Sequence, residues 1–222
     1  MSPADVNFGS VPGSGEVYLT FDDGPDEEWT PRVLDILAAA GVQSTFFVVG
    51  RAARTTPALV RRIAAGGHEI GNHTYSHRHP WAMSEATARS EVREGAAAIT
   101  DIVGKAPQTY RPPHGRLRRC MVDEARHGGQ RTVLWNLSAV DWGPLGDAAR
   151  IANRLRAVAA GDIVLMHDGR CRHNRPDELT RVLPRFLADL ETRKLRPSRL
   201  LTYAKLAETP RAPARITQVQ AK

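Results

Sequence analysis

The stretch Thr20-Phe21-Asp22-Asp23-Gly24-Pro25 decides the fold of this chain and the place of its chemistry. The apolar and β-branched residues 17–20 predict a buried strand, and the Gly-Pro pair after the two carboxylates is a strong strand stop. Adjacent carboxylates at the end of a buried strand shift each other's pKa, so that one can bind a metal while the other transfers a proton. The alternative is a turn that merely caps the strand.

Strand and helix signals alternate along the rest of the chain. Thr30-Pro31 predicts a helix start with proline at the first helical position, and Thr56-Pro57 repeats that signal. A long helix is predicted from Ser84 to Val103, and others over 147–159 and 177–194. The predicted strands cover residues 17–22, 44–49, 68–72, 109–110, 132–137, 162–166 and 200–203.

This alternation predicts a parallel sheet with helical crossovers, because parallel neighbours cannot be joined by tight turns. Six or seven units allow either a closed barrel or an open doubly wound sheet. An open sheet gathers its ligand groups at one switch point, whereas a barrel mouth receives them from nearly every strand. In this chain, polar residues lie just past the carboxyl ends of nearly all the predicted strands, which favours an α/β barrel of about seven parallel strands. The residues are Asp22, Asp23, His73, His77, Arg111, His114, Asp141 and His167.

Length and composition are those of a single domain. The 222 residues are 41% hydrophobic, enough to bury a full core. We expect the domain over 16–206, a flexible leader over 1–15 and a disordered tail over 207–222. No apolar run predicts a signal peptide or a membrane span, so a cytoplasmic location is expected, or a secreted or periplasmic one if a leader was removed. Cys120 and Cys171 are predicted to be free thiols.

The net charge is +7 and the pI is about 10.0, but the arginines are scattered and aromatic residues make up only 6% of the chain. Nucleic-acid binding usually concentrates positive charge and aromatic residues on one face. We therefore predict a solvated basic surface, suited to an anionic polymer, and no nucleic-acid partner.

His73 and His77 are four residues apart in a segment predicted to be a loop or a first helical turn. In a helical turn this spacing places both imidazoles on one side. With a carboxylate from another strand they form a two-histidine, one-carboxylate set that leaves positions open for water and substrate. A histidine pair alone is often structural, but the neighbouring Asp22-Asp23 pair favours a catalytic divalent metal. The second Asp is then available as a base, and His167 at the end of an apolar strand is the predicted acid.

The alternative for His167 is a neutral side chain satisfied by the backbone. The four remaining histidines do not follow a predicted strand in a comparable motif, and we predict that they are structural or lie at the surface. They are His68, His79, His127 and His173.

Five motifs occur in a specific order between about Glu16 and Tyr203. They are TFDDGP (20–25), HTYSH (73–77), RPPHG (111–115), the Asp141-Trp142 pair and LMHD (165–168). Together they resemble the polysaccharide deacetylase family, the NodB-type domains of carbohydrate esterase family 4. The resemblance implies a distorted (β/α) barrel and metal-dependent removal of acetyl groups from carbohydrate. It also implies one divalent ion, Zn²⁺ or a similar ion such as Co²⁺, held by Asp23, His73 and His77.

The resemblance also implies roles for the other motif residues. Asp22 is the general base and His167 the general acid; Arg111 orients and tunes Asp22, and Asp141 polarises a catalytic partner. The residues expected at the substrate are Pro113, His114, Trp142 and Leu165, of which the last two wall the pocket for the acetyl methyl group.

The chain departs from the family pattern at two positions. His114 stands where the family has Tyr, and Ser138 stands where it has Asp. The family uses the backbone N–H at the position of His114 for the oxyanion, so this function does not depend on the side chain, but an extra imidazole at the mouth is expected to alter the preference for substrate or metal.

The resemblance implies an acetylated carbohydrate as the partner. The leading hypothesis is N-deacetylation of N-acetylglucosamine in chitooligosaccharide, peptidoglycan or another exopolysaccharide, with O-acetyl esterase activity on xylan as a variant. The rival is a non-catalytic carbohydrate-binding relative.

Overall fold

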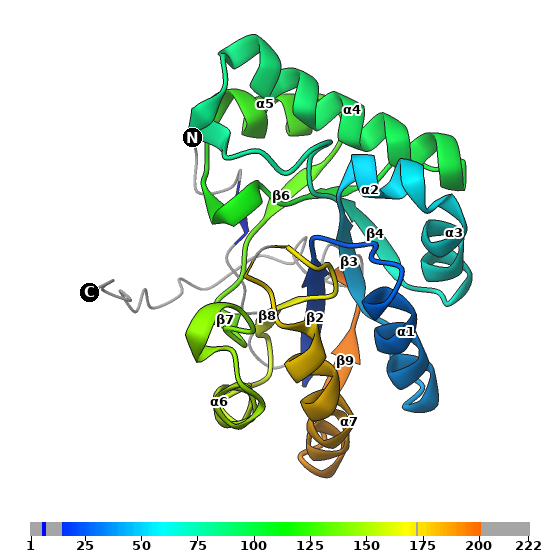
Figure 1. The fold of residues 1–222 in the computed structure, drawn as a ribbon, viewed down its shortest axis with the longest axis vertical. Coiled ribbons are helices and arrows are strands. Elements are labelled where there is room, and N and C mark those ends of the chain that lie inside the picture. Colours follow the sequence, from blue (N-terminus) through cyan, green and yellow to red (C-terminus); the bar gives the residue numbers. More distant parts are fainter. Residues whose placement is uncertain (1–5, 8–14, 172, 201–222) are drawn as a thin grey trace.

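The structure is a computed structural model, and it describes residues 6–7, 15–171 and 173–200. A curled sheet of parallel strands lies at the centre, and helices surround its outer side (Figure 1). The strand order is β1-β6-β5-β4-β3-β2-β8-β7, and β9 pairs with β2. The strands are β1 (Val6–Asn7), β2 (Glu16–Asp22), β3 (Thr45–Val48), β4 (Glu69–Asn72), β5 (Thr109–Tyr110), β6 (Arg131–Val133), β7 (Leu137–Ser138), β8 (Ile163–His167) and β9 (Arg196–Ser198).

The helices begin close to their predicted start signals. Ser84 accepts a hydrogen bond from the N–H of Thr87 at the start of α4, and Asp147 accepts one from Arg150 at the start of α6. The α-helices are α1 (Trp29–Ala39), α2 (Gly50–Thr55), α3 (Pro57–Ala65), α4 (Glu85–Val103), α5 (Arg119–His127), α6 (Ala148–Leu155) and α7 (Pro176–Thr192). The 3₁₀ turns η2 (Pro80–Ala82), η3 (Pro113–Gly115) and η4 (Gly143–Leu145) lie in loops of the described part of the chain.

The predicted distorted α/β barrel of parallel strands is confirmed, and it is an incomplete one. Because β1 and β7 stand at opposite ends of the strand order, the sheet curls without closing. The single strand predicted over 132–137 is wrong: β6 pairs with β5, whereas β7 pairs with β8. The chain leaves the ladder between them because the carbonyl groups of Val133 and Leu134 accept hydrogen bonds from the Arg111 guanidinium.

Several predicted boundaries are also wrong, among them the end of the helix predicted over 147–159, which stops at Leu155. Helix α1 begins at Trp29 rather than at Pro31 after an N-cap at Thr30, because the Asp26 carboxylate accepts the hydrogen bonds of the N–H groups of Glu28 and Trp29. The last described strand, β9, precedes the predicted 200–203; Leu200 lies outside it, and residues 201–203 and 207–222 lie outside the described residues. Within the expected leader, Val6–Asn7 pairs with β6.

Side chains alternate along β2, and this alternation places the first site residue. Odd-numbered residues of 17–21 pack in the main hydrophobic cluster with side chains of α1, α3 and α7. Tyr18 faces the other way and packs against Phe47 and Ile163 inside the barrel. Because Asp22 is in phase with Tyr18, β2 delivers its carboxylate to the interior at the carboxyl end of the strand.

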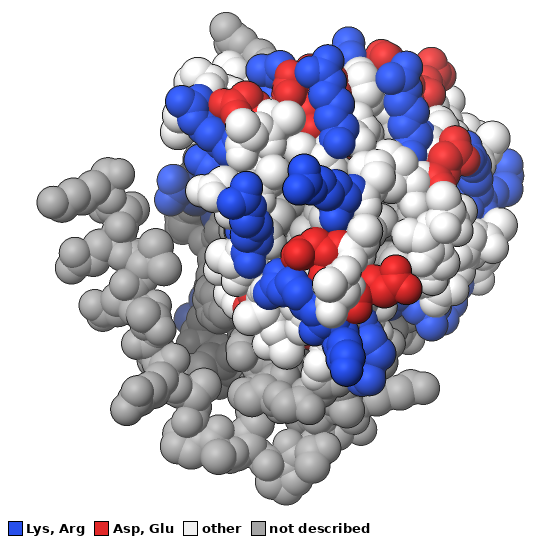
Figure 2. All heavy atoms as spheres, turned by 90° about the horizontal axis from the view of Figure 1, so that it is seen from below, with Lys and Arg blue, Asp and Glu red and all other residues white. Residues whose placement is uncertain are grey.

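Basic residues are distributed over the surface. Figure 2 shows Lys and Arg spread over one face with Asp and Glu between them. Exposed ion pairs such as Arg62–Asp35 and Arg193–Asp189 contribute to this mixture. The face shown therefore lacks the single-sign stripe typical of nucleic-acid binding. Among the described residues, no helix is long and apolar enough to cross a membrane.

Candidate active site

The carboxyl ends of the strands meet around a cavity of about 500 Å³. The parallel register makes Asp22 on β2 the Cα partner of His167 on β8, so the two side chains stand side by side at the mouth. His73 follows β4 directly, and Arg111 follows β5. The cavity is lined by Asp22, Asp23, His73, His77, His114, Trp135, Trp142, Leu165, His167, Cys171, His173 and Asn174.

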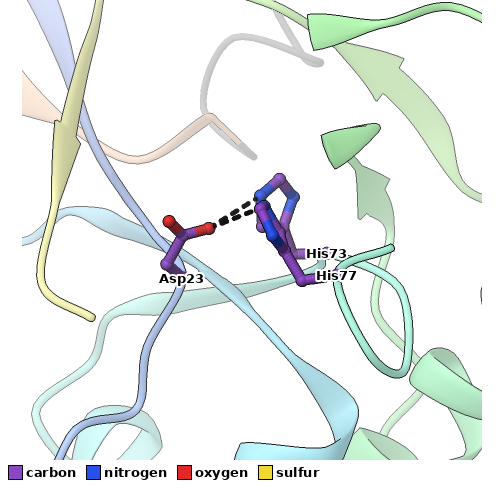
Figure 3. A group of neighbouring side chains, drawn as sticks. All are labelled: Asp23, His73 and His77. Atoms are coloured by element: carbon purple, nitrogen blue, oxygen red, sulfur yellow. Dashed lines mark ion pairs between the residues drawn. The ribbon is translucent and has the colours of Figure 1, made fainter. Parts of the chain in front are cut away.

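Asp23, His73 and His77 point toward one another across this cavity (Figure 3). Oδ1 of Asp23 lies 2.9 Å from Nε2 of His77 and 3.3 Å from Nε2 of His73. One ligand atom from each residue lies within 4.8 Å of the other two. The set predicted from the sequence is therefore assembled, with donors from two separate segments of the chain.

The surroundings of these donors fit a divalent cation. Oδ1 of Asp23 is buried and, apart from its ion-pair contacts with the two histidines, has no hydrogen-bond partner in the described part of the chain, while Oδ2 accepts a hydrogen bond from Asn174 (2.7 Å). Nδ1 of His73 donates to the carbonyl oxygen of Arg111 (2.8 Å), which leaves Nε2 free to bind a metal. Burial alone would raise the pKa of Asp23, but the imidazoles of His73 and His77 hold that pKa well below its usual range.

The segment that carries both histidines is a loop, one of the two predicted possibilities, and not the helical turn that the spacing of the histidines also fits. Thr74 and His77 have positive φ angles of 67° and 55°. The Asn72 carboxamide accepts a hydrogen bond from the N–H of Thr74, and the Glu91 carboxylate accepts one from Ser76 (2.8 Å). Helix α4 therefore supplies, through Glu91, the buried acceptor that holds this loop in place.

Asp22 is held by a fully buried arginine. Nη1 of Arg111 donates to Oδ1 of Asp22 (2.7 Å) and to the hydroxyl of Thr20 (2.7 Å), which lies on the same side of β2. The guanidinium lies over the ring of Phe47, with its carbon 4.1 Å from the ring centroid. All these contacts orient Arg111, so the carboxylate it holds has one orientation. The other oxygen of Asp22 lies 3.8 Å from Nε2 of His73.

His167 is paired with a completely buried carboxylate. Asp141 accepts hydrogen bonds from Nδ1 of His167 (2.9 Å) and from its backbone N–H (2.7 Å). Burial lowers the pKa of His167, but the charge and hydrogen bond of Asp141, with smaller effects from Asp23 and Asp22, raise it to about 9. The imidazole is therefore protonated at neutral pH and has a proton to donate. A neutral His167 satisfied by the backbone does not fit this geometry.

Comparison with known proteins agrees with this geometry. Residues 10–133, more than half of the chain, match the polysaccharide deacetylase family. The chain belongs to this family. It is 38% identical over 164 residues to a chitooligosaccharide deacetylase of Bradyrhizobium sp. (strain ANU 289), a match that covers 73% of this chain and 75% of that protein. It is 33% identical over 209 residues to a peptidoglycan-N-acetylglucosamine deacetylase of Bacillus cereus, covering 91% and 96% of the two chains.

A solved structure has the same fold. The crystal structure of the Bc1960 peptidoglycan N-acetylglucosamine deacetylase superimposes with a TM-score of 0.83 at 32% identity, covering 90% of this chain and 92% of that one. The distorted barrel of this polysaccharide deacetylase is therefore that of its family.

The two departures from the family pattern have local structural explanations. Ser138 keeps a hydrogen-bonding role, because its hydroxyl accepts a bond from the N–H of Val140 (3.0 Å) in the turn before Asp141. His114 lines the cavity, and its ring lies 4.8 Å from that of His77. Partial burial in the cavity, with His77 and His79 nearby, lowers its pKa. Pro113, also expected at the substrate, is buried and does not line the cavity.

Four cavity-lining residues were not predicted as site residues: Trp135, Cys171, His173 and Asn174. Asn174 bonds to Asp23, and an antiparallel bridge joins it to Trp142. No motif connects positions 23 and 174, so no signal in the sequence predicts this contact. Cys171 is a free thiol, as expected; burial, and secondarily Asp23, raises its pKa to about 12, which leaves it un-ionised.

Three of the four other histidines, His68, His79 and His127, lie outside the lining of the cavity, as expected, whereas His173 belongs to that lining. His68 is buried, its Nδ1 accepts a hydrogen bond from the N–H of Ser44, and burial with Arg199 lowers its pKa to about 4. His79, His127 and His173 are exposed, although His173 also lies at the rim of the cavity.

Proposed function

We propose that this chain is a metal-dependent N-deacetylase that hydrolyses the N-acetyl group of N-acetylglucosamine residues in chitooligosaccharide or peptidoglycan. The observation that carries the proposal is the arrangement at the cavity. A carboxylate held by Arg111 and an imidazolium held by Asp141 stand on adjacent strands, beside a two-histidine, one-carboxylate set. The relatives named above act, by their names, on these two substrates.

Asp23, His73 and His77 would hold one divalent ion. Two imidazoles and one carboxylate with open positions suit Zn²⁺, which we propose as the ion, and the same donors also accept Co²⁺. When bound, such an ion supplies a Lewis acid that polarises a carbonyl and lowers the pKa of water.

The protein's own groups would carry the proton transfers. Asp22, with Oδ1 held by Arg111, accepts a proton from the attacking water. His167 donates a proton to the amide nitrogen as the C–N bond breaks, because an amine leaves poorly until it is protonated. The acetate carbon then carries the water oxygen, and the sugar keeps a free amine.

The remaining cavity residues would position the acetyl group. We assign the backbone N–H of His114 as the donor to the carbonyl oxygen, at the position that the family uses. Trp142 and Leu165 form an apolar wall for the methyl group; the Trp142 ring also meets the His167 ring edge-on at 5.4 Å.

Acetate release by the metal-loaded protein tests the proposal. The substrates are an N-acetylated chitotetraose, a peptidoglycan-derived glycan and an acetylated xylan oligomer, and the control variant is Asp22→Asn. We expect release from an N-acetylated glycan that is strongly reduced in the variant. Release from xylan alone would replace the proposal with an O-acetyl esterase. Binding of glycans without any release would establish the non-catalytic alternative.

A further inference from the structure

Trp81 is the most exposed large apolar side chain among the described residues. Its exposed fraction is 64%, and Leu145 at 49% is the other such residue. A single exposed apolar side chain is common on protein surfaces and by itself indicates nothing. Trp81 differs in its place, because it lies in η2, four residues after the metal-site residue His77.

A row of rings leads from the metal site toward Trp81. The centroids of His77 and His114 are 4.8 Å apart, and the ring of His79 stacks on His114 at 5.5 Å with an interplanar angle of 25°. Nδ1 of His79 accepts a hydrogen bond from the backbone N–H of Trp81 (3.3 Å). His79 and His114 are themselves exposed, so the row forms a surface that continues outward from the cavity.

The backbone on both sides of Trp81 is held in place by Arg118. Nη1 of Arg118 donates to the carbonyl oxygens of Pro80 (2.7 Å) and Met83 (2.9 Å), on either side of Trp81. The same guanidinium lies 5.4 Å from the centroid of the indole ring. Trp81 is therefore ordered although most of its surface is in water, and a ligand that binds it meets little entropy cost for ordering the side chain.

We propose that Trp81 is a stacking platform for a sugar residue of the substrate other than the one that loses its acetyl group. The inference rests on the proposed function and adds a distal subsite to it. One face of a pyranose ring carries C–H groups, which pack on an aromatic face, while its hydroxyl groups remain in water. The side chains of His114 and His79 would contact the glycan between the cavity and this platform. The occupant is therefore a glycan several sugars long.

Chain-length dependence tests the platform. The variants are Trp81→Ala, Trp81→Phe as the conservative replacement, and Leu145→Ala as a matched exposed apolar control. The substrates are N-acetylated chitobiose and chitopentaose. For Trp81→Ala we expect kcat/KM on the pentaose to fall about tenfold through KM, as for other interface tryptophans, with the disaccharide unchanged. Trp81→Phe should retain most of the wild-type value, and Leu145→Ala all of it.

Three results would overturn the platform: equal losses on both substrates, no loss on either, or the same loss in Leu145→Ala. Calorimetric binding of chitopentaose gives a readout independent of turnover, and Trp81→Ala should weaken it about tenfold as well. Absence of acetate release from either substrate by the wild type would refute the proposed function. Release with a length dependence unaffected by Trp81→Ala would refute only the distal subsite.

Discussion

Replacing Asp141 by Asn removes the charge that keeps His167 protonated. The buried Asp141 carboxylate accepts two hydrogen bonds from His167, one from Nδ1 and one from the backbone N–H. Asn has nearly the same shape but only one acceptor oxygen, so one N–H of His167 would face the amide group of the new side chain. The substitution therefore removes a charge and breaks a hydrogen bond with little change in volume.

The size of the effect follows from the pKa of His167, which is raised from 6.5 to about 9. At 1.36 kcal/mol per pH unit, this difference corresponds to roughly 3 kcal/mol of stability. Because the pKa is higher in the folded state, that contribution is fully present below pH 6.5 and is lost as the pH rises through about 9. If the pKa returned to about 6.5, the protonated fraction at pH 8 would fall roughly thirtyfold.

Two measurements check this reasoning. In the wild type, kcat/KM should fall on the alkaline side at or below pH 9, because a cation held by Asp23 offsets part of the negative charge near His167. In Asp141→Asn the same fall should occur more than one pH unit lower. The variant's loss of unfolding free energy in urea should be large at pH 6 and small at pH 9.5.

Asp162→Asn is the control for both measurements, because that carboxylate bonds Asn136 and the N–H of Ala159 away from the cavity. An alkaline limb at the same pH in wild type and Asp141→Asn, with an equal stability loss at both pH values, would refute the role assigned to Asp141.

Three further substitutions probe separate parts of the site, and one probes its backbone. His77→Ala should lower the metal content found by elemental analysis, and equal content in variant and wild type would contradict the ligand assignment. Asp22→Asn should reduce kcat by ~10²–10⁴-fold while the metal stays bound; unchanged turnover would require another base. His167→Ala should reduce turnover of an N-acetylated chitooligosaccharide more than that of an aryl acetate, and equal losses would exclude a general-acid role. In Gly169→Ala the added Cβ would lie 2.2 Å from the backbone of Asp23, so metal affinity measured by titration should fall, and wild-type affinity would show that the loop adjusts freely.

Local sequence was sufficient to predict the alternation of strands and helices and the position of the site at the carboxyl ends of the strands. Strand β2 was predictable because an apolar run ending in two carboxylates and Gly-Pro has few other solutions, and its alternation turns Asp22 inward. Parallel strands then bring every residue that follows a strand end to the same edge of the barrel. The positions of Asp22, His73, Arg111 and His167 after strand ends therefore predict that their side chains meet at one site.

The contacts themselves depend on residues that are distant in the chain, and only the tertiary structure decided them. The loop over 73–77 takes its shape from Glu91 and Asn72, not from helical spacing. The strand predicted over 132–137 divides because Arg111 takes two of its carbonyl groups. The protonation of His167 depends on a buried carboxylate 26 residues away. A hydrogen bond or a charge acts through distance and burial, and neither quantity can be obtained from the spacing of residues along a chain.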